Sequence, residues 1–119
     1  MPRADLARKD LSRASLSNSD LARADLRDVT LHEAYLRDAD LTDADLTGAD
    51  LRGSHLEGAT VAGATLDGAD LRDADLRGVD LTAAASMEGA KLEGAIGLPN
   101  GTATPPGTNR HGLEAGENV

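Results

Sequence analysis

The chain of 119 residues has no cysteine, phenylalanine or tryptophan, and Tyr35 is its single tyrosine. The absence of cysteine excludes a disulfide framework, thiolate catalysis and cysteine-ligated zinc, and it fits a reducing compartment. The near absence of aromatic rings means that the core lacks the side chains that usually bury the most area. Leucine and alanine must therefore build the core.

Long hydrophobic runs are absent as well. No apolar segment approaches the roughly 20 residues of a membrane span, and the N-terminal residues Met-Pro-Arg-Ala-Asp lack the apolar region of a signal peptide. We therefore expect a soluble, cytoplasmic protein that makes no membrane contact.

What the chain does have is a five-residue period. Leucine, or once valine, occupies every fifth position from Leu6 to Leu81, sixteen times in succession. On an α-helix a step of five rotates the side chain by roughly 140°, and on a flat strand it alternates between the two faces. A chain that turns a corner every five residues presents the same side chain inward each time, so the period predicts a solenoid. Its inward residues are Leu6, Leu11, Leu16, Leu21, Leu26, Leu31, Leu36, Leu41, Leu46, Leu51, Leu56, Val61, Leu66, Leu71, Leu76 and Leu81.

The other four positions of each unit also have preferred residues, numbered here from the leucine at position i. Position i−2 is nearly always small, which fits a second inward place where the chain bends close to the next coil. Position i−1 is aspartate in ten units and is expected to face water. Position i+2 is glycine in six units, where a positive φ is tolerated. In the first half polar residues such as Arg8 and Arg13 hold that place, so we expect a turn type there that does not need glycine.

The repeated pattern A-D-L-x-x, cleanest over residues 39–51, resembles the pentapeptide-repeat family. The resemblance implies an all-β fold: a right-handed, four-sided (quadrilateral) parallel β-helix solenoid with twenty residues per coil. Eighteen units would make about four and a half coils.

The register slips by one residue after Leu81 and resumes at Met87 and Leu92. We interpret the extra residue as a bulge at a corner. The sequence thus predicts a β-helix over residues 1–96 and a Gly/Pro-rich C-terminal tail over 97–119 that is flexible or docked on a partner. Ile96, Leu98 and Pro99 are expected to fold over the last coil.

Residues twenty apart should lie one above another, which makes one outer face distinct. It combines the row Ser15, Tyr35, His55 and Asp75 with the row Ser17, Arg37, Glu57 and Arg77. Because interfaces favour Tyr and Arg, the candidate partner-binding residues on this face are Tyr35, Arg37, His55 and Arg77.

The net charge of −9 is concentrated in the middle of the chain. Residues 1–27 carry six cationic against four acidic side chains, whereas residues 28–80 carry four against thirteen. Such a field repels nucleic acid and attracts cationic surfaces, so no direct binding of nucleic acid is expected. Three aspartates of this acidic segment are further candidate partner-binding residues: Asp40, Asp45 and Asp50.

No pattern points to catalysis, a cofactor or a metal ion. The aspartates recur regularly on an exposed scaffold, unlike a catalytic constellation. His32, His55 and His111 share no ligand spacing, so no metal site is predicted. Ser54 occupies an inward place and is interpreted as a tolerated small residue.

Two functions of different class remain. One is a non-catalytic scaffold that binds a protein partner through its faces, ends or tail. The alternative is DNA mimicry, because some members of the family inhibit DNA gyrase or protect it from quinolone drugs. Two features argue against DNA mimicry. Those members typically have phenylalanine at many central positions, which this chain lacks. The stack would also be only roughly 20 Å tall, less than one turn of DNA at ~34 Å, and only an end-to-end homodimer would exceed that length. A third hypothesis is an accessory subunit whose tail enters a larger assembly.

Overall fold

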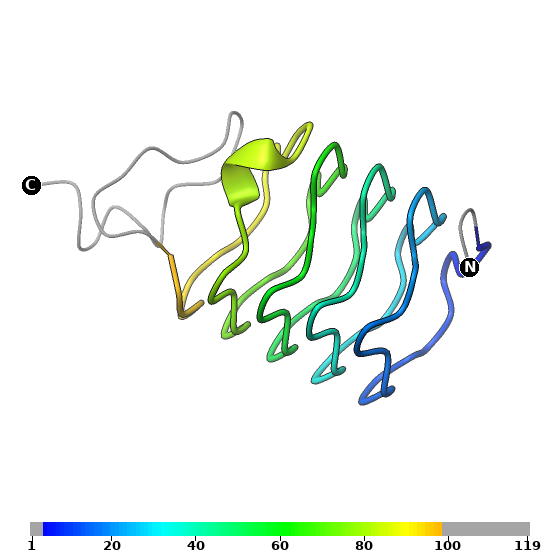
Figure 1. Cartoon of the computed structure of the whole chain (residues 1–119), viewed down its shortest axis with the longest axis horizontal. Helices are drawn as coiled ribbons and strands as arrows, with labels where there is room; N and C mark the ends of the chain where they lie inside the picture. Colours follow the sequence, from blue (N-terminus) through cyan, green and yellow to red (C-terminus); the bar gives the residue numbers. More distant parts are fainter. Residues whose placement is uncertain (1–3, 99–119) are drawn as a thin grey trace, which may run out of the picture.

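The chain winds into a stack of regular coils, seen in the computed structural model, which describes residues 4–98 (Figure 1). From Asp5 to Asp75, each five-residue unit contributes one residue to a parallel β-bridge and then turns a corner. The bridges join residues twenty apart, as in Asp25 to Asp45 and Tyr35 to His55. The predicted all-β solenoid is thus confirmed. Within residues 4–98 the one helical element is η1, a 3₁₀ turn over Leu81–Ala83.

Backbone hydrogen bonds hold neighbouring coils together on both sides of each bridge. In the unit of Leu46, the leucine N–H donates to the Thr65 carbonyl at 2.7 Å, and the Asp45 N–H donates to the Ala24 carbonyl at 3.0 Å. The turn is closed when the Ala49 N–H donates to the Leu46 carbonyl at 2.9 Å. The same three bonds recur in most units, so each inner coil is tied to the coils before and after it.

The core is a column of leucines and small residues. From Leu21 to Leu81 every residue of the leucine series is buried, and Met87 and Leu92 continue it after the register slip. The i−2 residues also point inward, with Ala24, Ala64 and Ala69 almost fully covered. In the first coil Leu6, Leu11 and Leu16 are half-buried, because they pack on a coil from one side only.

The expectation of a different turn type in the first half is wrong. The residue at i+2 has a positive φ in both halves, as in the third residue of a type II turn. The non-glycine residues in this conformation have φ between 55° and 64° and are Arg8, Arg13, Asn18, Arg23, Asp28, Glu33, Asp38, Asp43 and Asp73. At some positions of the later coils glycine also leaves room for a side chain: a Cβ on Gly48 or Gly63 would meet the carboxylate of Asp28 or Asp43 in the coil before, so that carboxylate would have to shift.

The left-handed residues of the first half make a stability prediction. Arg23 has a φ of 61° and an exposed side chain. Glycine adopts this conformation without the Cβ penalty, although it loses more entropy on folding. We expect Arg23→Gly to raise the free energy of unfolding by about 0.5–1 kcal/mol in urea titrations. Arg23→Ala is the matched control, since it keeps the Cβ and should change stability little. Equal stability of the two variants would contradict the idea.

The extra residue after Leu81 is accommodated mainly by η1 rather than by a simple bulge. Asp80 caps η1, accepting a hydrogen bond from the Thr82 N–H at 3.1 Å, and the Ala84 N–H closes the turn on the Leu81 carbonyl at 3.1 Å. Short 3₁₀ turns are common as connectors between regular segments. Beyond η1 the bridges join residues 21 apart, as in Asp75 to Ile96.

The expectation that Ile96 folds over the last coil is wrong. Its side chain is 51% exposed, because it occupies the outward i−1 place opposite Asp75. Leu98 does pack against the core, whereas Pro99 and the rest of the predicted tail lie outside the described residues. No helix within residues 4–98 has the length and apolar character needed to cross a membrane.

Candidate protein-binding face

The repeated aspartates at i−1 stabilise the turns. The Asp40 carboxylate accepts hydrogen bonds from the Thr42 N–H at 3.0 Å and from the Thr42 hydroxyl at 2.6 Å. Asp45 holds Thr47 in the same way, at 3.1 and 2.6 Å. A carboxylate that bonds the backbone two residues on is an Asx-turn, which explains why aspartate recurs before each corner. The sequence interpretation assigned these residues only to the solvent and missed this role.

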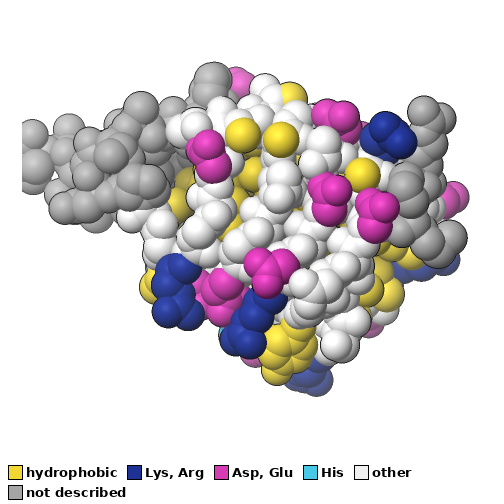
Figure 2. Space-filling model, viewed as in Figure 1, with side chains coloured by type: hydrophobic (Ala, Val, Ile, Leu, Met, Phe, Trp, Pro, Cys, Tyr) yellow, Lys and Arg dark blue, Asp and Glu magenta, His cyan; other side chains and the backbone are white. Residues whose placement is uncertain are grey.

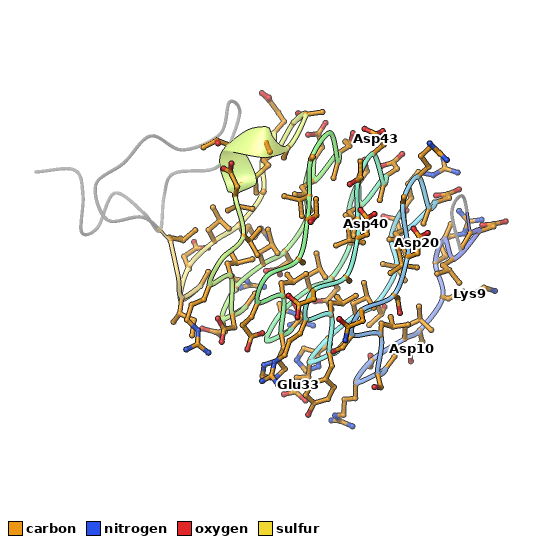
Figure 3. The ribbon with its side chains drawn as sticks, in the orientation of Figure 1. Lys9, Asp10, Asp20, Glu33, Asp40 and Asp43 are labelled. Atoms are coloured by element: carbon orange, nitrogen blue, oxygen red, sulfur yellow. The ribbon has the colours of Figure 1, made fainter. Side chains whose placement is uncertain are left out.

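The candidate residues Asp40, Asp45 and Asp50 do not form one acidic patch. Each belongs to a different row of bridges, pairing onward with Thr60, Thr65 and Asp70 respectively. Figure 3 shows Asp20 and Asp40 in one row on neighbouring coils. On the side seen in Figure 2, acidic side chains are scattered and alternate with basic ones along the lower edge.

Several of these carboxylates are paired with an arginine two residues on. Arg52 donates to Asp50 at 2.9 and 2.8 Å, and Arg77 donates to Asp75 at 2.9 and 2.6 Å. Bidentate pairs of this kind are the strongest side-chain hydrogen bonds. The bond to Arg77 lowers the pKa of Asp75 from its ordinary 3.8 to about 2, and Arg27 does the same for Asp25.

These pairs predict a loss of stability in acid. Because the folded pKa of Asp75 lies below its ordinary value, its pairing stabilises the fold above about pH 4 and is lost as the pH falls toward about 2. The same sign holds for Asp25. We expect urea midpoints to drop across this window. In Arg77→Gln the drop should be shallower, since Asp75 then titrates closer to its ordinary value. Parallel curves for wild type and Arg77→Gln would contradict the assignment.

One row carries the distinctive side chains predicted from the sequence. Bridges join Ser15 to Tyr35, Tyr35 to His55, His55 to Asp75 and Asp75 to Ile96. The rings of Tyr35 and His55 stack in parallel, with centroids 4.9 Å apart and planes 4° apart. Tyr35 is 43% exposed, and Tyr35 and Ile96 are the two exposed large hydrophobic residues within residues 4–98. The row therefore has an aromatic pair at one end and an aliphatic side chain at the other.

A second row, of Arg37, Glu57 and Arg77, lies beside it, and Glu57 pairs with both arginines. The Arg37 guanidinium donates to Glu57 at 3.0 Å from the coil before, and that of Arg77 lies 3.6 Å from Glu57 in the coil after. His55 Nδ1 lies 4.0 Å from Glu57 Oε1. The structure thus brings Arg37, His55 and Arg77 around Glu57, which was not among the candidates, while Tyr35 joins them through its stacking on His55. The sequence does contain a signal for Glu57: it lies at position i+1, twenty residues from Arg37 on one side and from Arg77 on the other. We define the Tyr35 face by the residues Tyr35, Arg37, His55, Glu57, Asp75, Arg77 and Ile96.

Three residues of the Tyr35 face have the ligand types of a metal site. His55, Glu57 and Asp75 each offer one ligand atom, and these atoms lie within 4.8 Å of one another. His55 Nδ1 and Glu57 Oε1 are shielded from solvent and have no hydrogen-bond partner. Asp75 is buried, at 8% exposure.

Ser54, beside His55, has a structural role. Its side chain is fully buried, and its hydroxyl donates to the Leu51 carbonyl at 2.7 Å. The Ser54 hydroxyl therefore has its hydrogen-bond partner within its own turn, and it points into the core, away from the Tyr35 face.

Comparison with known proteins agrees with this architecture. The family model described as pentapeptide repeats matches in eight copies, over residues 10–48, 44–82 and 56–96. No curated protein matches the chain by sequence. Among solved structures, the chain is similar to the pentapeptide repeat protein Rfr23 from the cyanobacterium Cyanothece 51142, with 38% identity and a TM-score of 0.70, covering 83% of this chain and 62% of that one. The chain thus spans less than two thirds of the length of Rfr23.

Two further structures are similar. A pentapeptide repeat protein from the Arabidopsis thaliana thylakoid lumen has 33% identity and a TM-score of 0.62, covering 86% of this chain and 68% of that one. QnrB1, a plasmid-mediated fluoroquinolone resistance protein, has 21% identity and a TM-score of 0.51, covering 88% and 63%, which shows a likeness of fold alone. With its unbroken five-residue period, its stacked parallel bridges and these matches, the chain belongs to the pentapeptide repeat family of right-handed β-helices.

Proposed function

We propose that the protein is a non-catalytic scaffold that binds a protein partner through the Tyr35 face. One observation carries the proposal: Tyr35 and Ile96, the two exposed large hydrophobic residues within residues 4–98, fall in the same row. Three coil steps of about 4.8 Å separate them, so they span roughly 14 Å. Two anchors at that distance suit a single partner surface.

The side chains between the anchors support the same role. Arg37 and Arg77 are each held by Glu57, and His55 is held against Tyr35. Tyrosine and arginine dominate the binding energy of many interfaces. Because these side chains are already ordered on a β-scaffold, a partner would lose less entropy in fixing them.

Site-specific photo-crosslinking followed by binding measurements tests the proposal. A photoreactive residue at Tyr35 should crosslink a protein in native cells, and the same residue at Thr60, exposed in another row, should not. The crosslinked protein is then identified and purified, and its affinity is measured by calorimetry. We expect Tyr35→Ala to weaken binding about tenfold or more, and Ile96→Ala to weaken it as well.

Thr60→Ala is the control for these variants and should bind like the wild type. If the purified protein binds wild type and Tyr35→Ala equally well, the Tyr35 face is not the interface. If Tyr35 yields no crosslink beyond that at Thr60, the scaffold proposal fails at its first step.

DNA mimicry is the alternative function, and it is tested independently. The net charge of −9 favours it. Against it, Asp50, Asp70 and Asp75 are neutralised by arginines in the fold, which breaks up the acidic surface. We expect no inhibition of DNA gyrase supercoiling, and no protection from quinolones, at micromolar protein. Inhibition at that concentration would instead support the mimic.

We also infer that the scaffold is a four-sided solenoid of about four and a half coils. From Asp5 to Asp75 a bridge residue recurs every five residues, and a turn follows each one, which gives four per twenty-residue coil over residues 1–60. Eighteen repeat units at four per coil give the coil count. A crystal structure would test both features directly.

A further inference from the structure

The Tyr35 face contains two polar atoms that lack partners. His55 Nδ1 and Glu57 Oε1 are shielded from solvent, lie 4.0 Å apart, and make no hydrogen bond. Buried polar atoms in native proteins are nearly always satisfied, and an exception often marks the place of a water molecule or an ion. Here two such atoms lie close together, and both belong to residue types that coordinate metals.

We propose that His55, Glu57 and Asp75 bind a divalent transition-metal ion, with zinc as the representative. Zinc binds imidazole nitrogen and carboxylate oxygen at about 2.0–2.2 Å and prefers a tetrahedral arrangement. Ligand atoms in such a site are roughly 3.4 Å apart, and these three lie within 4.8 Å of one another. Small rotations of the side chains would close the difference. Three protein ligands leave a fourth position for water or for a group from another molecule.

The fold places these ligands with little freedom. His55 and Glu57 flank Leu56, whose buried side chain anchors their corner. His55 is bridged to Asp75 in the next coil, and its ring is stacked on Tyr35. The imidazole favours zinc, copper or nickel over magnesium and calcium, which select oxygen ligands.

Arg77 competes with a metal ion for the same carboxylates. Its guanidinium donates to Asp75 at 2.6 Å and lies 3.6 Å from Glu57. Arg37 holds only Glu57 Oε2, which leaves Oε1 available. Because the Arg77 side chain is 65% exposed, it can swing into solvent when an ion binds. Removal of Arg77 should therefore strengthen metal binding.

Calorimetric titration of the untagged full chain with zinc chloride tests the site. We expect one zinc ion per chain in the wild type and little binding of magnesium. His55→Gln should weaken zinc binding by about tenfold or more, as loss of a metal-supporting group typically does. Arg77→Gln should tighten it. His32→Gln is the matched control, since it removes a histidine outside the ligand set and should bind like the wild type.

Circular dichroism of each variant verifies that the fold is intact before titration. The proposal is overturned if His55→Gln binds zinc as the wild type does, or if the wild type binds none. It is also overturned if Arg77→Gln weakens binding, because Arg77 would then support the ion rather than compete with it. These outcomes are separable from the protein-binding proposal, which is measured with the partner and without zinc.

Discussion

Leu46→Asp is expected to abolish folding. Leu46 is 1% exposed in the middle of the inward column, and its neighbours in the core are apolar. A buried carboxylate without a partner costs several kcal/mol, while the whole domain is stabilised by only about 5–15 kcal/mol. Since each coil is supported only by the coils on either side, the loss of one coil removes support from its neighbours. Far-ultraviolet circular dichroism should show loss of the β-signal.

Thr60→Asp is the matched control for Leu46→Asp. It introduces the same carboxylate at an exposed i−1 place, where aspartate recurs in other units and accepts a bond from the backbone two residues on. We expect a change in stability of less than about 1 kcal/mol. A Leu46→Asp variant that keeps the β-signal and a cooperative melt would refute the inward leucine column.

Ala44→Leu is expected to have the second largest effect, a loss of about 2–3 kcal/mol. Ala44 is 1% exposed at an i−2 place, where its N–H closes the turn on Leu41 at 3.0 Å. Cores are packed as densely as organic crystals, so extra methylene groups force shifts of side chains and backbone. Urea or thermal unfolding, followed by circular dichroism, measures the loss.

Ala44→Val provides the graded comparison for Ala44→Leu. Val29 holds the same i−2 place three units earlier and is fully buried, so the i−2 place can hold a valine without distortion of the coil. We expect Ala44→Val to cost less than about 1.5 kcal/mol. If the leucine variant is as stable as the valine variant, the size limit at i−2 is not a packing constraint.

The repeat made much of the fold predictable. Once the leucines were assigned inward, residues twenty apart fell into rows, and the stacking of Tyr35 on His55 follows the row predicted from that spacing. Such prediction works because the β-bridge ladder is periodic, so position in the unit determines direction in space. The candidates Arg37 and Arg77 were placed on the same face for the same reason.

Other features could not be predicted because they depend on contacts between side chains. The Asx-turn of Asp40 with Thr42 is set by rotamers rather than by spacing. The spacing places Arg37, Glu57 and Arg77 in one row, but the ion pairs between them also depend on rotamers. Glycine at Gly63 was interpreted as a requirement of the turn, although Asp43 adopts the same positive φ. A Cβ at Gly63 would meet the Asp43 carboxylate in the coil before, a contact that depends on the rotamer of Asp43.

The order of amino acids suffices to establish the solenoid, its inward leucines and the face that carries Tyr35, because all three follow from a strict period. The tertiary structure determines which conformation absorbs the extra residue after Leu81 and which contacts form between the outer side chains. The η1 turn over Leu81–Ala83 shifts the pairing from 20 to 21 residues and thereby brings Ile96 into the row of Tyr35. Tertiary packing also brings His55, Glu57 and Asp75 within ligand distance. The extra residue itself is visible in the sequence, but the 3₁₀ turn that absorbs it and the close approach of the three ligand atoms depend on contacts between coils.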